Sequence, residues 1–167
     1  MRFRHAISFV LTVTCIAGSR ASGQETPPRT WGTVGLGGSS LGFVSVSISG
    51  TYQTGHNLLS LRGTENSEGL FDNEYWDIGL AYGYGTVEHD YDLGIGLGIA
   101  AVGGTEGHGI FGGERTTLPI KIGLPLEARA FWHITGWLGL GVYGFANINA
   151  TRSWVGATAS LEIGLLR

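Results

Sequence analysis

The sequence predicts an all-β fold, an eight-stranded antiparallel up-and-down transmembrane β-barrel. From Leu118 to Ile134 every second residue is apolar, and this period of two is the period of a β-strand. The same alternation recurs in seven other segments. Charged residues make up only 14% of the chain, whereas about 25% is usual in soluble domains. A barrel whose apolar face meets lipid, with its few charges inside, accounts for all three observations.

The first 23 residues have the pattern of a secretory signal peptide. Arg2 and Arg4 give a basic start, residues 6–17 are mostly apolar, and the small residues that follow fit cleavage after Ala21 or Gly23. An apolar stretch of this length is too short to cross a bilayer as a helix, since a spanning helix needs about 20 residues. The segment therefore predicts that the chain is exported.

A short polar lead-in is predicted over residues 24–30, and the barrel domain over residues 31–167. At 167 residues the chain has the length of one domain. A single cysteine excludes an internal disulfide framework and a cysteine-based zinc site. The net charge of −3, with no basic cluster, gives no support for nucleic-acid binding. No cofactor is expected.

In the first four predicted strands, large apolar residues alternate with small or polar ones. Residues 33–37 alternate valine and leucine with threonine and glycine, and residues 44–52 alternate aliphatic residues mainly with serine. Residues 59–62 alternate leucine with serine and arginine. Residues 76–84 alternate tryptophan, isoleucine, leucine and tyrosine with aspartate, glycine and alanine. Each segment therefore has one apolar face and one small or polar face.

The last four predicted strands cover residues 93–99, 118–134, 138–148 and 155–165, in which aliphatic residues alternate with glycine, hydroxyl, aromatic or charged residues. Pro125 lies in the middle of the longest of them, where it cannot donate a ladder hydrogen bond. At about 3.3 Å per residue this strand also exceeds one bilayer crossing. We expect it to bend at Pro125 or to project beyond the membrane.

The connections between the predicted strands alternate in length. Residues 54–57, 87–91 and 133–137 are short links, whereas residues 64–74 and 103–117 are long, polar and rich in glycine. If both ends of the barrel domain lie on the periplasmic side, the short links lie there too and the long stretches face outwards. Outer-membrane barrels have this arrangement.

Aromatic residues are predicted to form girdles at the two membrane interfaces, where amphipathic rings are enriched. Five lie near the predicted periplasmic rim and one near the opposite rim. In sequence order these residues are Trp31, Tyr52, Trp76, Tyr82, Tyr84 and Trp132.

Six charged residues are predicted to point into the barrel and to pair there, because isolated charges in an apolar wall are costly. They are Arg62, Asp77, Lys121, Glu127, Arg129 and Glu162. Three are basic and three are acidic, so this set has a net charge of zero. The interior of an eight-stranded barrel is barely wide enough for its side chains. The balanced set therefore favours a plugged ionic interior over an open pore.

The chain resembles the small outer-membrane β-barrels of the OmpA/OmpX-like kind. The likeness rests on the eight alternating strands, the polar loops, the ionic interior and the glycine-rich stretch Gly139–Asn149. Among these barrels the chain looks most like uncharacterised bacterial envelope proteins. The resemblance implies an integral outer-membrane protein with a structural or surface-interaction role and no enzymatic activity. Its implied partners are outer-membrane lipids and the barrel assembly machinery.

Other motifs give weaker indications of chemistry. Residues 139–144 have the spacing of a dinucleotide-binding fingerprint, but no helical segment follows them. Two acidic groups of residues have carboxylates that could hold Ca²⁺ or Mg²⁺, although their spacing fits no EF-hand and solvated loops explain them better. These groups are Glu65, Glu68, Asp72 and Glu74, and then Glu88, His89, Asp90 and Asp92. No metal site is therefore predicted.

Two alternatives to the leading interpretation stay open. One is a soluble secreted barrel of the lipocalin type, a binding module whose apolar face points inwards. The other is a barrel enzyme that modifies envelope lipids, for which His56, His108 and His133 are the histidines to inspect. No serine–histidine–carboxylate set is imposed by the spacing, and solvated loop histidines are the simpler interpretation.

Overall fold

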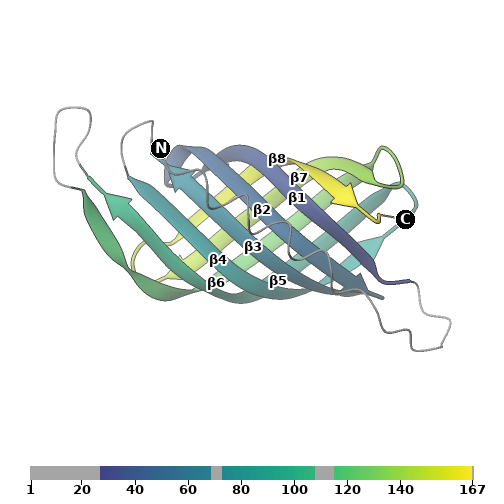
Figure 1. The fold of residues 1–167 in the computed structure, drawn as a ribbon, viewed down its shortest axis with the longest axis horizontal. Coiled ribbons are helices and arrows are strands. Elements are labelled where there is room, and N and C mark those ends of the chain that lie inside the picture. Colours follow the sequence, from purple (N-terminus) through teal and green to yellow (C-terminus); the bar gives the residue numbers. More distant parts are fainter. Residues whose placement is uncertain (1–26, 69–72, 108–114, 167) are drawn as a thin grey trace.

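The computed structural model describes residues 27–68, 73–107 and 115–166. They form a closed barrel in which each strand pairs antiparallel with its neighbour in sequence and β8 pairs with β1 (Figure 1). The strands are β1 (Arg29–Ser39), β2 (Gly42–Thr54), β3 (Asn57–Ser67), β4 (Glu74–Val87), β5 (Tyr91–Glu106), β6 (Thr116–His133), β7 (Leu138–Asn149) and β8 (Trp154–Gly164). Among these residues, no helix is long and apolar enough to cross a membrane.

The predicted fold class and all eight predicted strands are confirmed, and most strands are longer than predicted. β1 begins at Arg29, because Arg29 and Thr30 already pair with β2, so the predicted lead-in is two residues too long. The predicted loops 64–74 and 103–117 are shorter for the same reason, since the ladders continue to the ends of β3 and β5. The predicted signal peptide and residues 24–26 of the lead-in lie outside the described residues.

The two ends of the barrel differ. At one end, here called the turn end, lie the β2–β3, β4–β5 and β6–β7 turns, the start of β1 and the end of β8. At the other end, the loop end, β1, β3, β5 and β7 end and β2, β4, β6 and β8 begin. The strands run obliquely to the barrel axis (Figure 1).

β6 projects beyond the barrel at the loop end, which is one of the two predicted outcomes for this strand. Residues 116–122 pair with β5 alone, because pairing of β6 with β7 starts only at Gly123. Inside the barrel the β5–β6 ladder is interrupted between Gly123 and Leu126. Pro125 lies in this gap, and its missing N–H explains the interruption.

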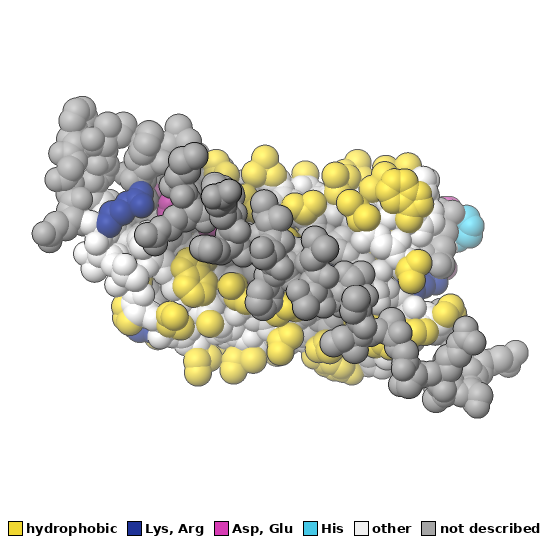
Figure 2. All heavy atoms as spheres, in the orientation of Figure 1, with side chains coloured by type: hydrophobic (Ala, Val, Ile, Leu, Met, Phe, Trp, Pro, Cys, Tyr) yellow, Lys and Arg dark blue, Asp and Glu magenta, His cyan; other side chains and the backbone are white. Residues whose placement is uncertain are grey.

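The outer and inner faces of the barrel have opposite polarity. Large aliphatic side chains point outwards on every strand, among them Leu36, Ile95 and Val142, which are 63%, 66% and 54% exposed. The side chains that point inwards and are buried include many serines and threonines and seven ionisable residues. Figure 2 shows hydrophobic side chains along the flank, with charged and histidine side chains at the two ends. This is the reverse of the lipocalin alternative, which needs an apolar interior.

The inner wall is built from two kinds of strand. The inward positions 79, 81, 83 and 85 of β4 and 94, 96, 98 and 100 of β5 carry only glycine and alanine. On β6 the inward residues Glu127 and Arg129 have long side chains that reach this wall. A Cβ atom added to Gly96 would lie 2.9 Å from Glu127 Oε1, and one added to Gly94 would lie 2.9 Å from Arg129 Cδ. The glycines of β5 therefore leave the space that the side chains of β6 occupy.

Candidate functional site

The barrel interior holds a network of buried ionisable side chains, and it is the candidate functional site. Its members come from five of the eight strands and are at most 5% exposed. They are Arg62, Asp77, Asp92, Glu127, Arg129, His133 and Glu162. Their contacts divide them into an Arg62 cluster near the middle of the barrel and an Arg129 cluster at the turn end.

The Arg62 cluster consists of Arg62 on β3, Asp77 on β4 and the side chains that contact Asp77. Arg62 Nη2 lies 2.8 Å from Asp77 Oδ2, and both side chains are completely buried. Thr64 and Asn147 also donate hydrogen bonds to this carboxylate, at 2.9 and 2.6 Å. Arg62 Nη1 donates to the carbonyl of Leu126 at 2.8 Å. One arginine thus faces one carboxylate, and three side chains satisfy that carboxylate.

The Arg129 cluster consists of Arg129, Asp92, His133 and Glu162. Arg129 donates from Nε to Asp92 Oδ1 at 3.1 Å and from Nη2 to Glu162 Oε1. Its Nη1 donates to the hydroxyl of Thr51 at 3.2 Å. His133 Nε2 lies 3.0 Å from Asp92 Oδ2. One arginine and one histidine therefore face two carboxylates.

Glu127 is the remaining buried carboxylate, and its contact is to an aromatic side chain. Tyr143 on β7 donates its hydroxyl to Glu127 Oε2 at 2.7 Å. Tyr143 belongs to an apolar cluster with Phe131, Phe145 and Trp154 on the inner wall. Glu127 thus lies against an aromatic surface with a single hydroxyl donor.

The predicted zero charge of the interior is wrong. Lys121 is exposed, because it lies on the part of β6 that projects beyond β7, so it does not join the network. Asp92, which the sequence interpretation assigned to a solvated hairpin, is buried in it. The described interior therefore carries two arginines and four carboxylates, and 2 − 4 gives a formal charge of −2 when His133 is neutral.

Asp92 and His133 are the members that the sequence interpretation missed, although the alternation contains a signal for both. His133 has the same parity as Glu127 and Arg129, so it points inwards with them. Asp92 has the same parity as the inward-facing Gly94. Both residues stand at strand ends, where the sequence favours a turn, but Asp92 is already paired with Phe131 in the β5–β6 ladder.

The predicted aromatic girdle is wrong for Trp31. This side chain is 4% exposed and points inwards, because it has the parity of the buried Thr33. Its ring lies 4.5 Å from the guanidinium carbon of Arg129, and with Leu58 and Leu166 it forms an apolar cluster at the turn end. The other predicted girdle residues point outwards, four of them exposed and one half-buried. They are Tyr52, Tyr82, Tyr84 and Trp132, and the half-buried Trp76.

The remaining candidate residues are dispersed. His56 is exposed, stacks on Tyr84 with a ring-centroid distance of 5.0 Å, and has Nδ1 3.1 Å from the carbonyl of Gly85. His108 and Asp72 lie outside the described residues. Residues 139–144 lie within β7, not in a loop before a helix, so they have no dinucleotide-binding context.

The carboxylates of the two predicted acidic groups do not form a single cluster in the described residues. Glu65 is exposed on β3, and Glu74 lies half-buried at the start of β4. Glu68 pairs with Arg152 at 3.3 Å. In the second group Glu88, His89 and Asp90 are exposed at the β4–β5 turn, where His89 Nδ1 lies 2.7 Å from Asp90 Oδ1.

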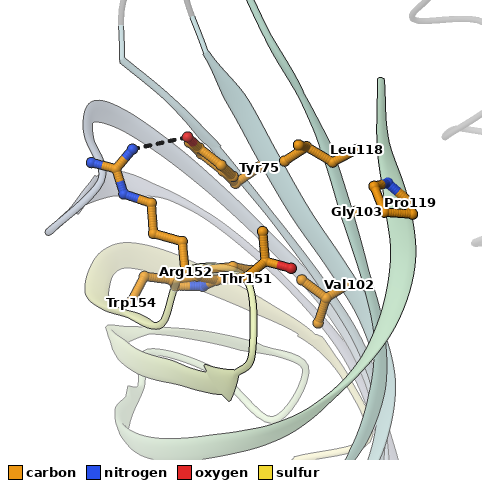
Figure 3. A pocket seen from close by; sticks show the side chains of 8 residues that line it. All are labelled: Tyr75, Val102, Gly103, Leu118, Pro119, Thr151, Arg152 and Trp154. Carbon is orange, nitrogen blue, oxygen red and sulfur yellow. Dashed lines mark hydrogen bonds between the residues drawn. The ribbon is translucent and has the colours of Figure 1, made fainter. Parts of the chain in front are cut away.

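A shallow depression lies at the loop end (Figure 3). Arg152, from the β7–β8 loop, donates to the hydroxyl of Tyr75 at 2.9 Å, and that hydroxyl donates to Glu106 at 2.7 Å. The hydrogen bond with Tyr75 is the main cause that raises the pKa of Arg152 above its ordinary value. These contacts tie the short β7–β8 loop to β4 and β5.

Solved structures with the same architecture align over most of this chain. The N-terminal β-barrel domain of Pseudomonas aeruginosa OprF matches with a TM-score of 0.60 and 13% identity, over 84% of this chain and 99% of that domain. Neisserial surface protein A matches with a TM-score of 0.57 and 17% identity, over 81% of this chain and 94% of that one. The fold is that of the small outer-membrane β-barrels.

Two further likenesses describe the same fold. Ail, the attachment invasion locus protein of Yersinia pestis, matches with a TM-score of 0.54 and 11% identity, over 82% of this chain and 96% of that one. A de novo designed transmembrane β-barrel matches with a TM-score of 0.53 and 14% identity, over 84% of this chain and 99% of that one. No protein-family model and no curated protein matches the sequence. At these identities the likeness to small outer-membrane barrels concerns the fold alone.

Proposed function

We propose that this chain is an integral outer-membrane β-barrel protein of a bacterial envelope, with a structural or surface-interaction role. The observation that carries the proposal is the polarity of the closed barrel, which has apolar side chains on its outer face and charged, hydrogen-bonded side chains inside. In a bilayer the outer face meets lipid and closure leaves no unpaired strand edge, so both faces are satisfied. In water the same outer face is a large exposed apolar surface.

The proposed orientation places the turn end in the periplasm and the loop end outside the cell. Short turns on the periplasmic side and longer loops outside are the rule for such barrels. Tyr52, Tyr82, Tyr84 and Trp132 point outwards at or near the turn end, where they fit the level of the lipid headgroups. The proposed partners are outer-membrane lipids, the barrel assembly machinery and a binding partner of the loops.

The proposed barrel is plugged. The Arg62 and Arg129 clusters cross the lumen, and apolar side chains fill space on both sides of them. An eight-stranded barrel has room for little besides its own side chains. We therefore expect vesicles that contain the protein to exclude small sugars and salts as well as protein-free vesicles do. Swelling of such vesicles at a rate that rises with protein content would overturn the plugged interior.

The proposed role is not enzymatic. His133 is buried and contacts Asp92, and the ring of His56 is stacked on Tyr84. The function is assigned instead to the surface at the loop end, where the β5–β6 ribbon projects.

Cell fractionation combined with heat-modifiable gel mobility tests the proposal. We expect the protein in the outer-membrane fraction, extractable only with detergent, and migrating differently before and after boiling because a closed barrel resists unfolding by the gel detergent. Extraction by buffer alone, together with one band under both conditions, would contradict the membrane assignment.

A further inference from the structure

Three side chains of the Arg129 cluster bring metal-ligand atoms together at the turn end. One oxygen of Asp92, one nitrogen of His133 and one oxygen of Glu162 all lie within 4.8 Å of one another. Asp92 Oδ2 and His133 Nε2 are 3.0 Å apart. Two donors on a tetrahedral zinc ion with bonds of about 2.0–2.1 Å lie roughly 3.4 Å apart. The Asp92–His133 pair is therefore already near the spacing that one metal ion needs.

The sheet register explains why His133 and Glu162 approach each other. Gly139 on β7 pairs with His133 on one side and with Glu162 on the other, so the three residues form one row across the inner wall. Because the middle residue has no side chain, nothing from β7 stands between the two outer ones. A Cβ atom added to Gly139 would lie 3.3 Å from Glu162 Oε2.

One carboxylate oxygen of Glu162 is free to accept a further contact. Its side chain is completely buried, and Oε2 has no hydrogen-bond partner among the described residues. An unsatisfied buried carboxylate oxygen is costly, and native structures contain few of them. The oxygen belongs to the same carboxylate that Arg129 contacts through Oε1.

The charge of the interior points in the same direction. The described interior has a formal charge of −2 when His133 is neutral. This excess of negative charge lies inside a closed wall whose outer side chains are apolar. One divalent cation would bring the sum to zero. Buried charge that is not compensated is expensive, so the deficit of two positive charges favours uptake of such an ion.

We propose that Asp92, His133 and Glu162 form a binding site for one divalent transition-metal ion, of which Zn²⁺ is the representative. One imidazole and two carboxylates are a donor set that suits zinc and its neighbours, whereas Ca²⁺ and Mg²⁺ take oxygen ligands. The site is independent of the envelope role proposed above, so either proposal can fail without the other.

Arg129 occupies the space beside the proposed ion and competes with it. Its Nη2 contacts Glu162, so binding of the metal requires the guanidinium to withdraw from that carboxylate. Two of its other contacts, the Thr51 hydroxyl and the Trp31 ring, do not involve the three ligands. A pocket of about 90 Å³ lies at the same end of the barrel, and Val87, one of the residues that line it, is paired with Asp92.

Titration of the folded full-length protein in detergent with Co²⁺ and Zn²⁺ tests the site. We expect one Co²⁺ per chain with the visible absorption of a low-symmetry site, displaced by Zn²⁺, and a thermal unfolding midpoint that rises with Zn²⁺ because the metal binds the folded state. His133→Ala and the size-conserving Glu162→Gln should each weaken binding at least about tenfold. Arg129→Gln should strengthen metal binding, because it removes the competing guanidinium. A purely structural role of Asp92, His133 and Glu162 would not produce this increase.

His56→Ala and His89→Ala are the matched controls, because both histidines are exposed and lie at the same end of the barrel. They should leave the stoichiometry and affinity unchanged. Absence of saturable one-to-one binding to the wild-type protein would overturn the site. Binding that survives both His133→Ala and Glu162→Gln, or that His89→Ala abolishes, would also overturn it, because the ion would then lie elsewhere.

Discussion

Arg62 and Arg129 are the two arginines buried in the described part of the barrel, and their surroundings differ. Arg62 faces one carboxylate, and Thr64 and Asn147 complete the hydrogen bonding of that carboxylate. Arg129 faces two carboxylates with a histidine beside them, and one oxygen of Glu162 has no hydrogen-bond partner among the described residues. The first cluster is a matched pair that joins strands, whereas the second has a surplus of acceptors. Burial of charge alone therefore does not distinguish a structural ion pair from a site with capacity for a ligand.

Removal of the matched carboxylate should have the largest effect. Asp77→Ala leaves the guanidinium of Arg62 buried without its counter-ion, and we expect a loss of about 3–5 kcal/mol in the free energy of unfolding. Urea unfolding of the protein in lipid vesicles measures it. The double variant Arg62→Met with Asp77→Leu should recover most of this loss, because no charge is then left unpaired. If Asp77→Ala lowered the free energy of unfolding by less than one ordinary hydrogen bond contributes, Asp77 would not be the counter-ion on which Arg62 depends.

Neutralising one carboxylate of the surplus cluster should cost less. Glu162→Gln weakens one contact of Arg129, but Asp92 still faces the guanidinium. We expect a loss of about 1.5–3 kcal/mol in the same unfolding experiment without metal, the range for a hydrogen bond to a charged group. Asp77→Asn is the matched substitution in the other cluster and should cost more than Glu162→Gln. The reverse order would contradict the distinction between the two clusters.

Removal of a neutral donor should have a smaller effect. Thr64→Val deletes the hydroxyl that donates to Asp77 while it keeps the shape of the side chain. We expect a loss of about 1 kcal/mol, because Arg62 and Asn147 continue to satisfy the carboxylate. Thr54→Val is the control, since Thr54 is exposed at the end of β2. Equal effects of the two substitutions would show that the Thr64 hydroxyl contributes nothing to the Arg62 cluster.

Substitution of Lys121 should have the smallest effect. Lys121→Ala removes an exposed charge from the projecting part of β6, and we expect a change within about 0.5 kcal/mol. A loss comparable to that of Glu162→Gln would place Lys121 in the network, as the alternation of the sequence alone suggested.

The alternation was sufficient to predict the strands and the face of most residues, because a period of two is a local property of the chain. The alternation does not show at which residue the pairing of a strand with its neighbour ends. Lys121 has inward parity but lies beyond the end of β7, and that length difference is a property of the pairing. The predictions for Asp92 and Trp31 are wrong for a related reason. Both residues stand near strand ends, where a position suggests a turn or a rim, but both have inward parity.

The partners of the buried charges could not be predicted in the same way. Asn147 on β7 reaches Asp77 on β4 across the lumen, and Glu162 meets Arg129 although β7 lies between their strands. Such contacts depend on the stagger of the closed sheet, which is fixed by all eight registers together. The set of interior charges was therefore largely predictable, whereas its division into two clusters was not.

The glycine wall of β4 and β5 links positions that are far apart in the sequence. The space that Gly96 leaves is filled by Glu127, and the space that Gly94 leaves is filled in part by Arg129. A descendant of this chain that acquires a bulky residue at 96 has to shorten the residue at 127. We therefore expect the side chains at 96 and 127, and those at 94 and 129, to change size in opposite directions during evolution. The summed side-chain volume of each pair should vary less than the volume at either position.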